Sequence, residues 1–474
     1  MRAFRNDNTD SNSLFAFNIR DFLPSDSDVF LFCDLVRNLD LSMFDGAYSS
    51  VGEKPIDPAL MLRTILYGLC YGVVSGNKLA TACRYDSRFV VLSGDQRPDR
   101  RTFDRFFIRH AGAMPDFFQS VVRLAQECGL VGLGRLAIDG TKIKANTSKH
   151  KAMSYGYMLK AVEKLETELC ALREAISSEN SEESTMDGRV PKEIARREKR
   201  LEAILAAKHR LEAEAHRKNL DKPEDNAQKS FNDLDALPIS NKGKEFLYGY
   251  NAQAAVDEKS QIVTGVTLHD SCNDTHGLAS VLKQSIENCE QSPKQVLADA
   301  AYGKDAANYS IIEDAGATPV IATGKGESEG RITLADLLEY DVEHDKYLCP
   351  AGRVFLNESS SGDGGKEVKL EKEFCGSCPR RAECPFFCKQ GRSVKVPPEK
   401  HRAARVANAA RMNTEEGKAD YRRRKAIVEP VFGNIKWNRG FRLYVKGREK
   451  VYARILVAFA AHNISKIVKA KMSA

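Results

Sequence analysis

Through the middle of the chain, short apolar segments, two of which run into an aspartate, alternate with segments whose apolar residues recur at helical spacing. The segment 136–138 runs into Asp139 and the segment 296–298 runs into Asp299, and each has the length and composition of a buried strand. From residue 133 onward the predicted order is strand, insertion, two strands, helix, strand, helix, strand. This order predicts a mixed α/β domain in which helices flank a mixed sheet.

The two aspartates stand where a buried strand meets the turn that follows it. Burying an unpaired carboxylate is costly, so such an acid needs a turn, a basic partner or a metal ion. The carboxyl ends of strands are also where α/β proteins place their sites. Taken singly, each aspartate fits a turn-forming residue. Taken together, Asp139 and Asp299 are candidate site residues.

A third acid, Glu429, stands alone in the basic and apolar stretch "AIVEPVFGNIKWNRGFR", residues 426–442. Lys425 and Lys436 would share a helical face with it if the helix continued through Pro430, a residue type that kinks helices. Glu429 therefore has two interpretations, a salt bridge to these lysines or a third metal ligand. Three carboxylates suit two Mg²⁺ or Mn²⁺ ions, hard cations that can activate a water or a DNA 3′-hydroxyl for phosphoryl displacement.

Residues 1–125 have the pattern of a helical domain. Asp57 is a predicted N-cap before a helix that begins at Pro58, and Asp99 is a predicted N-cap before "RRTFDRFFIRH". Three short helices with arginines on the third are compatible with a helix-turn-helix module, and equally with an amphipathic helix that has a charged outer face. The candidate DNA contacts on this helix are Arg100, Arg101 and Arg105.

Two segments interrupt the α/β pattern of residues 126–474. In residues 151–230, leucines recur every three and four positions in two runs, which predicts an antiparallel helical hairpin that projects from the body or pairs with another copy. Residues 325–400 are rich in Gly, Ser and Cys. Four cysteines there suit a structural Zn²⁺ site, or are reduced thiols under a loop: Cys349, Cys375, Cys378 and Cys384, with Cys388 as an alternative fourth ligand.

The composition narrows the class of protein. The chain has 474 residues and a net charge of +7, but residues 401–474 hold 18 Lys and Arg against 5 Asp and Glu. Such a basic segment suggests a polyanionic partner. The N-terminus lacks the apolar core of a secretory signal, and no apolar run approaches the ~18 residues of a membrane helix. We therefore expect a cytoplasmic protein without a membrane partner.

Several strings occur along the chain in a specific order. They are "YGLCYGVVSGNKLATACRYDSRFVVLSGDQRPDRRTFDRFFIRH", "AIDGTKIKANTSKH", "YGYNAQAAVD" with "NDTH", "LADAAYG", "YRRRKAIVEPVFGNIKWNRGFRLYVKGREKV" and "AHNISKI". In this order they resemble bacterial insertion-sequence transposases of the DDE type, closest to the IS1182 group of the IS5-like and IS4-like set. The resemblance covers nearly the whole chain.

This resemblance implies an RNase H-like catalytic domain whose metal-binding triad is Asp139, Asp299 and Glu429. The Tyr-Arg-Glu-Lys signature of related enzymes places a basic residue four positions before the glutamate and a lysine seven after it. Here Lys425 and Lys436 hold those positions, while Arg424 lies one place earlier. We count Arg424, Lys425 and Lys436 as candidate DNA contacts.

The implied activity is that of a DNA transposase with two Mg²⁺ or Mn²⁺ ions. It would bind the terminal inverted repeats of its element, hydrolyse the phosphodiester at each end and join the 3′-hydroxyls to target DNA. A homo-oligomer, such as a dimer, is implied because two ends must be brought together. The alternatives are a DNA-binding protein without catalysis and an RNase H-like nuclease without strand transfer.

Overall fold

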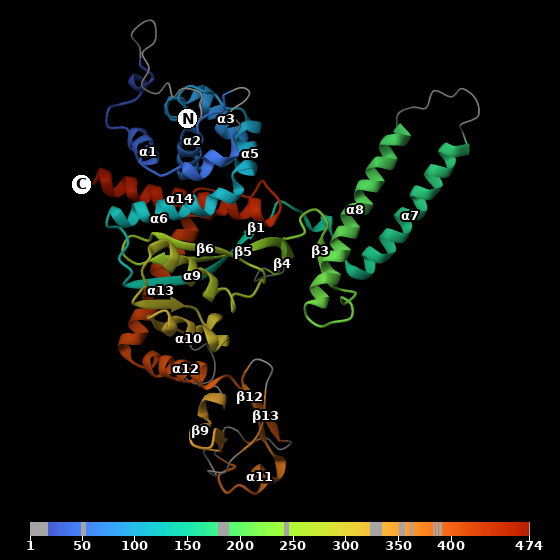
Figure 1. Cartoon of the computed structure of the whole chain (residues 1–474), viewed down its shortest axis with the longest axis vertical. Coiled ribbons are helices and arrows are strands. Elements are labelled where there is room, and N and C mark those ends of the chain that lie inside the picture. The colour runs from blue at the N-terminus through green and yellow to red at the C-terminus, as the bar shows by residue number, and fades with distance from the viewer. Residues whose placement is uncertain are drawn as a thin grey trace.

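The computed structural model describes residues 18–48, 54–178, 189–240, 246–322, 334–349, 356–360, 364–382, 384, 387 and 391–473. Figure 1 shows an N-terminal group of helices stacked on an α/β body, a long helical hairpin to one side and a small Cys-rich unit at the far end. The predicted Cys388 lies outside the described residues.

Among the described residues, six α-helices form the N-terminal group, and two of them begin at the predicted caps. Asp57 accepts a hydrogen bond from the N–H of Ala59, and Asp99 accepts one from the N–H of Thr102. The group consists of α1 (Asp28–Arg37), α2 (Pro58–Cys70), α3 (Gly76–Tyr85), α4 (Ser87–Ser93), α5 (Arg100–Arg109) and α6 (Met114–Glu127). The three predicted helices are α2, α3 and α5; the other three were not predicted individually, and one of them, α4, separates the second and third predicted helices.

The body is built on a mixed sheet that has six strands within the described residues. Its centre is β1, which pairs antiparallel with β5 on one side and parallel with β7 on the other. β5 also pairs with β4 and β6, and β7 pairs in parallel with β8. The bounds are β1 (Arg135–Lys144), β4 (Leu237–Ser240), β5 (Phe246–Asp257), β6 (Val263–His269), β7 (Gln295–Ala298) and β8 (Thr318–Ile321).

Helices cover both faces of this sheet, as the strand and helix order predicts. The helices α9 (Leu278–Cys289) and α10 (Ala307–Asp314) pack on the face that carries Leu136 and Ile138. The opposite face carries Ala137 and is covered by α13 (Glu415–Gly433). α12 (Glu399–Met412) lies beside β8 and α10. The structure therefore confirms a mixed α/β body with a helix-flanked sheet.

The helix α14 (Arg448–Met472) connects the N-terminal helices to the sheet. It packs against α1, α2 and α6 on one side and against β6 on the other, and Figure 1 shows it between the two layers. By length and composition α14 is apolar enough to cross a membrane, and 83% of its apolar stretch is buried inside the protein. The N-terminal helices and one face of the sheet therefore share one continuous hydrophobic core.

The helices α7 (Tyr155–Ser178) and α8 (Arg189–His216) pair as the predicted hairpin and project from the body in Figure 1. A two-stranded ribbon at the base, β2 (Ala152–Ser154) with β3 (Gln228–Ser230), connects them to the rest of the chain. Met158 and Ile204 are fully buried between the two helices.

A small unit follows β8 and has its own apolar cluster. In the described part of this unit the strands form a three-stranded and a two-stranded sheet, and Cys375 of a short helix joins the apolar cluster. The elements are β9 (Glu339–Asp341), β10 (Lys346–Leu348), β11 (Asn357–Ser360), β12 (Lys366–Leu370), α11 (Lys372–Ser377) and β13 (Arg392–Val396).

Candidate active site

The parallel pairing of β1 and β7 brings the two predicted aspartates together. Ala137 is paired with Leu297, so the same register places Asp139 beside Asp299, two residues further along each strand. Neighbouring strands lie about 4.8 Å apart, and side chains two positions apart point to the same face. Both carboxylates therefore lie on the face that α13 covers. Asp299 directly follows the carboxyl end of β7, as predicted, but Asp139 lies in the middle of β1, which continues to Lys144 instead of ending in a turn.

The helix α13 places an arginine against this pair. Nη1 of Arg424 donates to Oδ2 of Asp139 at 2.8 Å, and the side chains of Arg424 and Asp139 are only 7% and 19% exposed. One turn earlier, Asp420 accepts from Arg135 at 2.7 Å and from Gln295 at 3.0 Å. These contacts fix the position of α13 along both β1 and β7. Arg424, one place before the signature position, is therefore the arginine that the fold places at the site.

The electrostatics of the pair are those of a cation-binding position. Burial raises the pKa of Asp139, the Arg424 guanidinium opposes that rise, and the negative charge of Asp299 adds to it. Oδ1 of Asp139 accepts from the N–H of Gly140 at 2.8 Å, and Oδ1 of Asp299 accepts from the N–H of Ala301 at 2.9 Å. Two adjacent carboxylates with one guanidinium in contact with Asp139 retain an excess of negative charge that a divalent cation would neutralise.

Glu429 lies outside this group. It is exposed, as is Lys425. Glu429 follows Arg424 by five residues, which is about 140° around an α-helix, so the sheet-facing position one turn after Arg424 belongs to Val428. The helix continues through Pro430 and then widens into a π-helix, Asn434–Asn438, a type of segment that is frequent at functional sites. The assignment of Glu429 as third ligand stays a prediction.

The lysine predicted after Glu429 lies in the π-helix. Lys436 is partly buried, and burial together with the nearby charge of Lys142 lowers its pKa. Among the ion pairs between described residues none involves Glu429, so the predicted salt bridge to Lys425 or Lys436 is not formed. Lys436 and Lys142 together keep positive charge close to the ends of β1 and α13.

Within the described residues, no group of three or more His, Cys, Asp or Glu side chains is arranged to hold a metal ion. Asp139 and Asp299 fit two of the ligand positions of a Mg²⁺ site, since both offer carboxylate oxygens side by side. Arg424 now satisfies one of these oxygens. A third oxygen donor would have to come from a residue, such as Glu429, that this structure places elsewhere.

Sequence reasoning missed a polar network on the opposite face of β1, directly behind Asp139. Asp274 accepts from Lys142, Asn251 and Gln253 at 2.7, 2.8 and 2.7 Å. A Cβ on Gly140 would lie 2.4 Å from Oδ1 of Asp274, so the Asp274 carboxylate occupies the space that a side chain at position 140 would need. The signal in the sequence was the pair of polar residues at alternate positions in the otherwise apolar string "YNAQAAV", which places both on one face of a buried strand.

Tyr302 connects this network to the aspartate pair. It follows Asp299 on the same turn, is fully buried, and its hydroxyl donates to Oε1 of Gln253. Burial, and then the negative charges of Asp274, Asp139 and Asp299, raise its pKa. Tyr302 therefore keeps its proton and ties the turn that carries Asp299 to β5.

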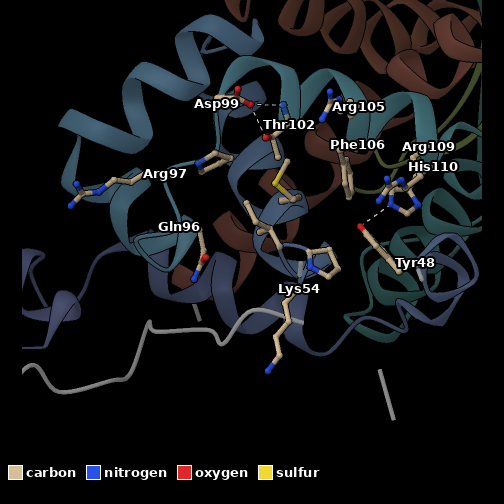
Figure 2. A pocket seen from close by; sticks show the side chains of 14 residues that line it. Tyr48, Lys54, Gln96, Arg97, Asp99, Thr102, Arg105, Phe106, Arg109 and His110 are labelled. Atoms are coloured by element: carbon tan, nitrogen blue, oxygen red, sulfur yellow. Dashed lines mark hydrogen bonds between the residues drawn. The ribbon is translucent and has the colours of Figure 1, made fainter. Parts of the chain in front are cut away.

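The predicted DNA-contact helix, α5, lies at the surface of the N-terminal group. Arg101 and Arg105 are exposed, and Arg100 forms an exposed ion pair with Asp104. Figure 2 shows Arg105 and Arg109 on the wall of a pocket of about 490 Å³, near the buried pair His110 and Tyr48. The arginines are thus on the outer face of an amphipathic helix, as predicted, and their contact with DNA stays a prediction.

The four predicted zinc ligands lie in the small unit after β8. Cys349 and Cys375 are buried in its apolar cluster, and Cys384 packs against that cluster. Cys378 is partly buried. The unit thus gathers three of the four cysteines around one core, but not in a metal-holding arrangement. The zinc site stays a prediction.

Comparisons with known proteins match two segments of the chain. Residues 348–468 match the family model of a transposase DDE domain, and residues 17–109 match a transposase domain described as DUF772. Neither the curated proteins nor the solved structures compared contain a match. The first segment includes Arg424, Glu429 and Lys436, and the second includes α5. Together the two matches fit an insertion-sequence transposase.

Proposed function

We propose that this chain is the DDE transposase of a bacterial insertion sequence of the IS1182 group, acting in the cytoplasm on DNA. It would bind the terminal inverted repeats, cut the phosphodiester at each end and join the 3′-hydroxyls to target DNA. The observation that carries this proposal is the register of β1 and β7, which sets Asp139 beside Asp299 under Arg424. The matches to transposase domains and a sheet compatible with an RNase H-like domain support it.

Asp139 and Asp299, with Glu429 as third oxygen donor, are the residues that would hold Mg²⁺ or Mn²⁺, two ions in the complete site. Bound there, the ions would activate a water or a 3′-hydroxyl and stabilise the leaving oxygen. Glu429 would have to approach from its exposed position. Such a change would involve the end of α13, where Pro430 removes one backbone hydrogen bond and the π-helix follows four residues later.

The basic residues have separate tasks in this proposal. Arg424 contacts Asp139 and favours its ionised form against the effect of burial. Lys425 and Lys436 supply positive charge for the DNA backbone, a contact that positions DNA without reading its sequence. Arg100, Arg101 and Arg105 on α5 are proposed to contact the element ends. A homodimer would bring the two ends together.

The test uses purified full-length protein, DNA carrying the element end, and Mg²⁺ or Mn²⁺. We expect nicking at the 3′ end that is lost in Asp139→Asn, Asp299→Asn and Glu429→Gln, each by at least about 100-fold because each removes charge stabilisation in the transition state. DNA binding should persist in all three. The matched control is Asp314→Asn, a surface carboxylate paired with Lys400. Cleavage that survives all three substitutions would reject the triad.

The exposed position of Glu429 favours one competing function, a DNA-binding protein that has kept the fold without catalysis. Such a protein would bind element ends and leave them uncut with either metal. A nuclease without strand transfer is the other alternative. It would cut the same DNA but would not join a precut 3′-hydroxyl end to a target plasmid, whereas a transposase would.

A further inference from the structure

A basic groove runs past the end of β1, outside the sites assigned above. It has a volume of about 790 Å³ and is bounded by the end of β1, the entry to the helical hairpin and the segment 441–446 that follows the π-helix. None of its lining residues is acidic. Four are cationic and exposed, namely Lys144, Lys151, Arg442 and Lys446.

The segment 441–446 presents its charges in a regular way. Burial alternates along it, so that Phe441 and Leu443 enter the core while Arg442, Tyr444 and Lys446 are exposed. Four residues of chain span at most about 14 Å, so the two cations stand within the length of a few phosphates of a DNA strand. Tyr444, 47% exposed, lies between them and offers an aromatic face to a base.

The charges of this groove are not neutralised within the protein. No ion pair between described residues involves Lys144, Lys151, Arg442 or Lys446. Nζ of Lys446 donates to the neutral Oδ1 of Asn232 at 2.7 Å. The nearby Asp233 is buried and accepts from Tyr250 at 2.7 Å. Four uncompensated cations on one concave surface attract a polyanion.

The groove is also connected to the strand that carries Asp139. Nδ2 of Asn146 donates to the carbonyl of Tyr444 at 2.9 Å, which fastens the segment 441–446 to the end of β1. Lys144 lies five residues after Asp139 on the same strand, about 16 Å at the rise of a β-strand, and this odd spacing places its side chain on the opposite face of the sheet. A DNA strand whose phosphodiester lies at Asp139 would therefore reach the groove within a few nucleotides by passing around the end of β1.

We propose that this groove is the track for the DNA backbone next to the phosphodiester that is cut. Lys144, Arg442 and Lys446 contact successive phosphates and Tyr444 stacks against an unpaired or frayed base. The proposal rests on the transposase function for its substrate, but the binding it describes is independent of catalysis and of DNA sequence.

The experiment measures binding of a short fluorescein-labelled DNA duplex of arbitrary sequence by anisotropy over a range of salt concentrations. The full-length protein carries Asp139→Asn to prevent cutting. The test variant adds Lys144→Gln and Lys446→Gln, and its matched control adds Lys259→Gln and Lys294→Gln. These two lysines are exposed and lie near the opposite ends of β1 and β7. Arg442→Gln is measured alone.

We expect the slope of log K against log salt to fall by about 1.8 in the test variant and about 0.9 in Arg442→Gln, since each lost phosphate contact removes about 0.9. The control should match the parent. Equal slopes in the test and control variants would overturn the proposal. So would an RNA duplex that binds as tightly as DNA and whose salt slope falls by the same amount in the test variant. Cleavage is measured separately, with protein that keeps Asp139. If that protein cuts DNA while the test and control variants have equal salt slopes, the groove is rejected and the proposed function is not. A reduced slope without cleavage would reject the proposed function alone.

Discussion

Arg424 is the residue on which the charge of the aspartate pair depends. It is buried, its guanidinium contacts Asp139, and the negative charge of Asp299 also acts on it. Of the groups acting on Asp139, burial and Asp299 favour the protonated acid, while Arg424 favours the carboxylate. Since only a carboxylate binds a divalent cation, Arg424 sets the acid end of the pH range in which the site can work.

Replacing Arg424 with Gln should therefore shift the acid limb of the pH–cleavage profile to higher pH. The substitution removes the group that lowers the pKa of Asp139, so the pKa rises further and the carboxylate is lost at a higher pH as the solution is acidified. The control is Arg423→Gln, which removes an exposed arginine paired with Glu258. Profiles of the two variants with the same acid limb would contradict this role.

The residues of the candidate site differ in how far their positions could be predicted from the sequence. Asp139 and Asp299 were singled out because each follows a short apolar segment and because the resemblance names both, although an aspartate after a strand is by itself common. That the two lie side by side depends on the parallel register of β1 and β7, which the sequence pattern did not specify. Glu429 was found as an isolated acid. Its side chain points away from the aspartate pair because it follows Arg424 by five residues on α13, and the π-helix that comes after α13 could not be predicted from the apolar periodicity. Asp274 was missed because its partners lie on two strands, β1 and β5, far from it or from each other in the sequence.

At the scale of elements, two buried asparagines complete the outer strands of the main sheet. The side chain of Asn463 on α14 accepts from the N–H of Val263 and donates to its carbonyl, both at 2.8 Å. Asn408 on α12 does the same for Ile321, at 3.0 and 2.9 Å. Each side chain thus replaces the neighbouring strand that β6 or β8 lacks at that position, and ties a C-terminal helix to a sheet edge.

Substituting Leu for either Asn463 or Asn408 should lower the free energy of unfolding by about 2–5 kcal/mol. The substitution leaves one buried N–H and one buried carbonyl without partners, and each unsatisfied group costs about 1–3 kcal/mol. Urea unfolding followed by circular dichroism measures the change. Asn77→Leu is the control, because Asn77 is exposed on α3. A loss no larger than that of the control would show that the two asparagines do not stabilise the edges.

The order of elements was largely predictable and their edges were not. The strands β1, β5, β6, β7 and β8 and the hairpin α7–α8 follow from apolar period and turn residues. β4 was missed, since a four-residue edge strand carries too short a pattern. α4 was missed because it is only seven residues long, between its N-cap Asp86 and its C-cap Gly94. A helix this short carries too little apolar periodicity to be recognised. The packing of α14 into both layers depends on tertiary contacts that its uniform apolar pattern does not specify.

At the scale of the whole molecule, one hydrophobic core joins the N-terminal helices to the sheet and buries two histidines. His110 lies beside Tyr48, and burial followed by the charge of Arg109 lowers its pKa to about 4. His462 on α14 bonds to the carbonyl of Gln261, and burial lowers its pKa to about 3. Both histidines are therefore neutral in the folded protein at pH 5, whereas in the unfolded chain they are charged.

The protein should therefore lose stability as the pH falls from 7 to 5. Between about pH 6.5 and 4 the unfolded chain binds protons that the folded chain does not, so each buried histidine removes about 2 kcal/mol by pH 5. We expect His462→Gln to be less stable than wild type at pH 7 but to lose about 2 kcal/mol less on going to pH 5, measured by urea unfolding. An identical loss in variant and wild type would exclude His462 as a cause.

The shared core has a consequence for the folding of the chain during its synthesis on the ribosome. The N-terminal helices are made first, yet α14, made last, supplies much of the surface against which they pack. Hundreds of residues must emerge before those early helices can close their core, so the nascent chain exposes apolar surface for most of its synthesis. The N-terminal helices therefore depend on the last helix of the chain to complete their core, which links the two ends of the sequence in folding.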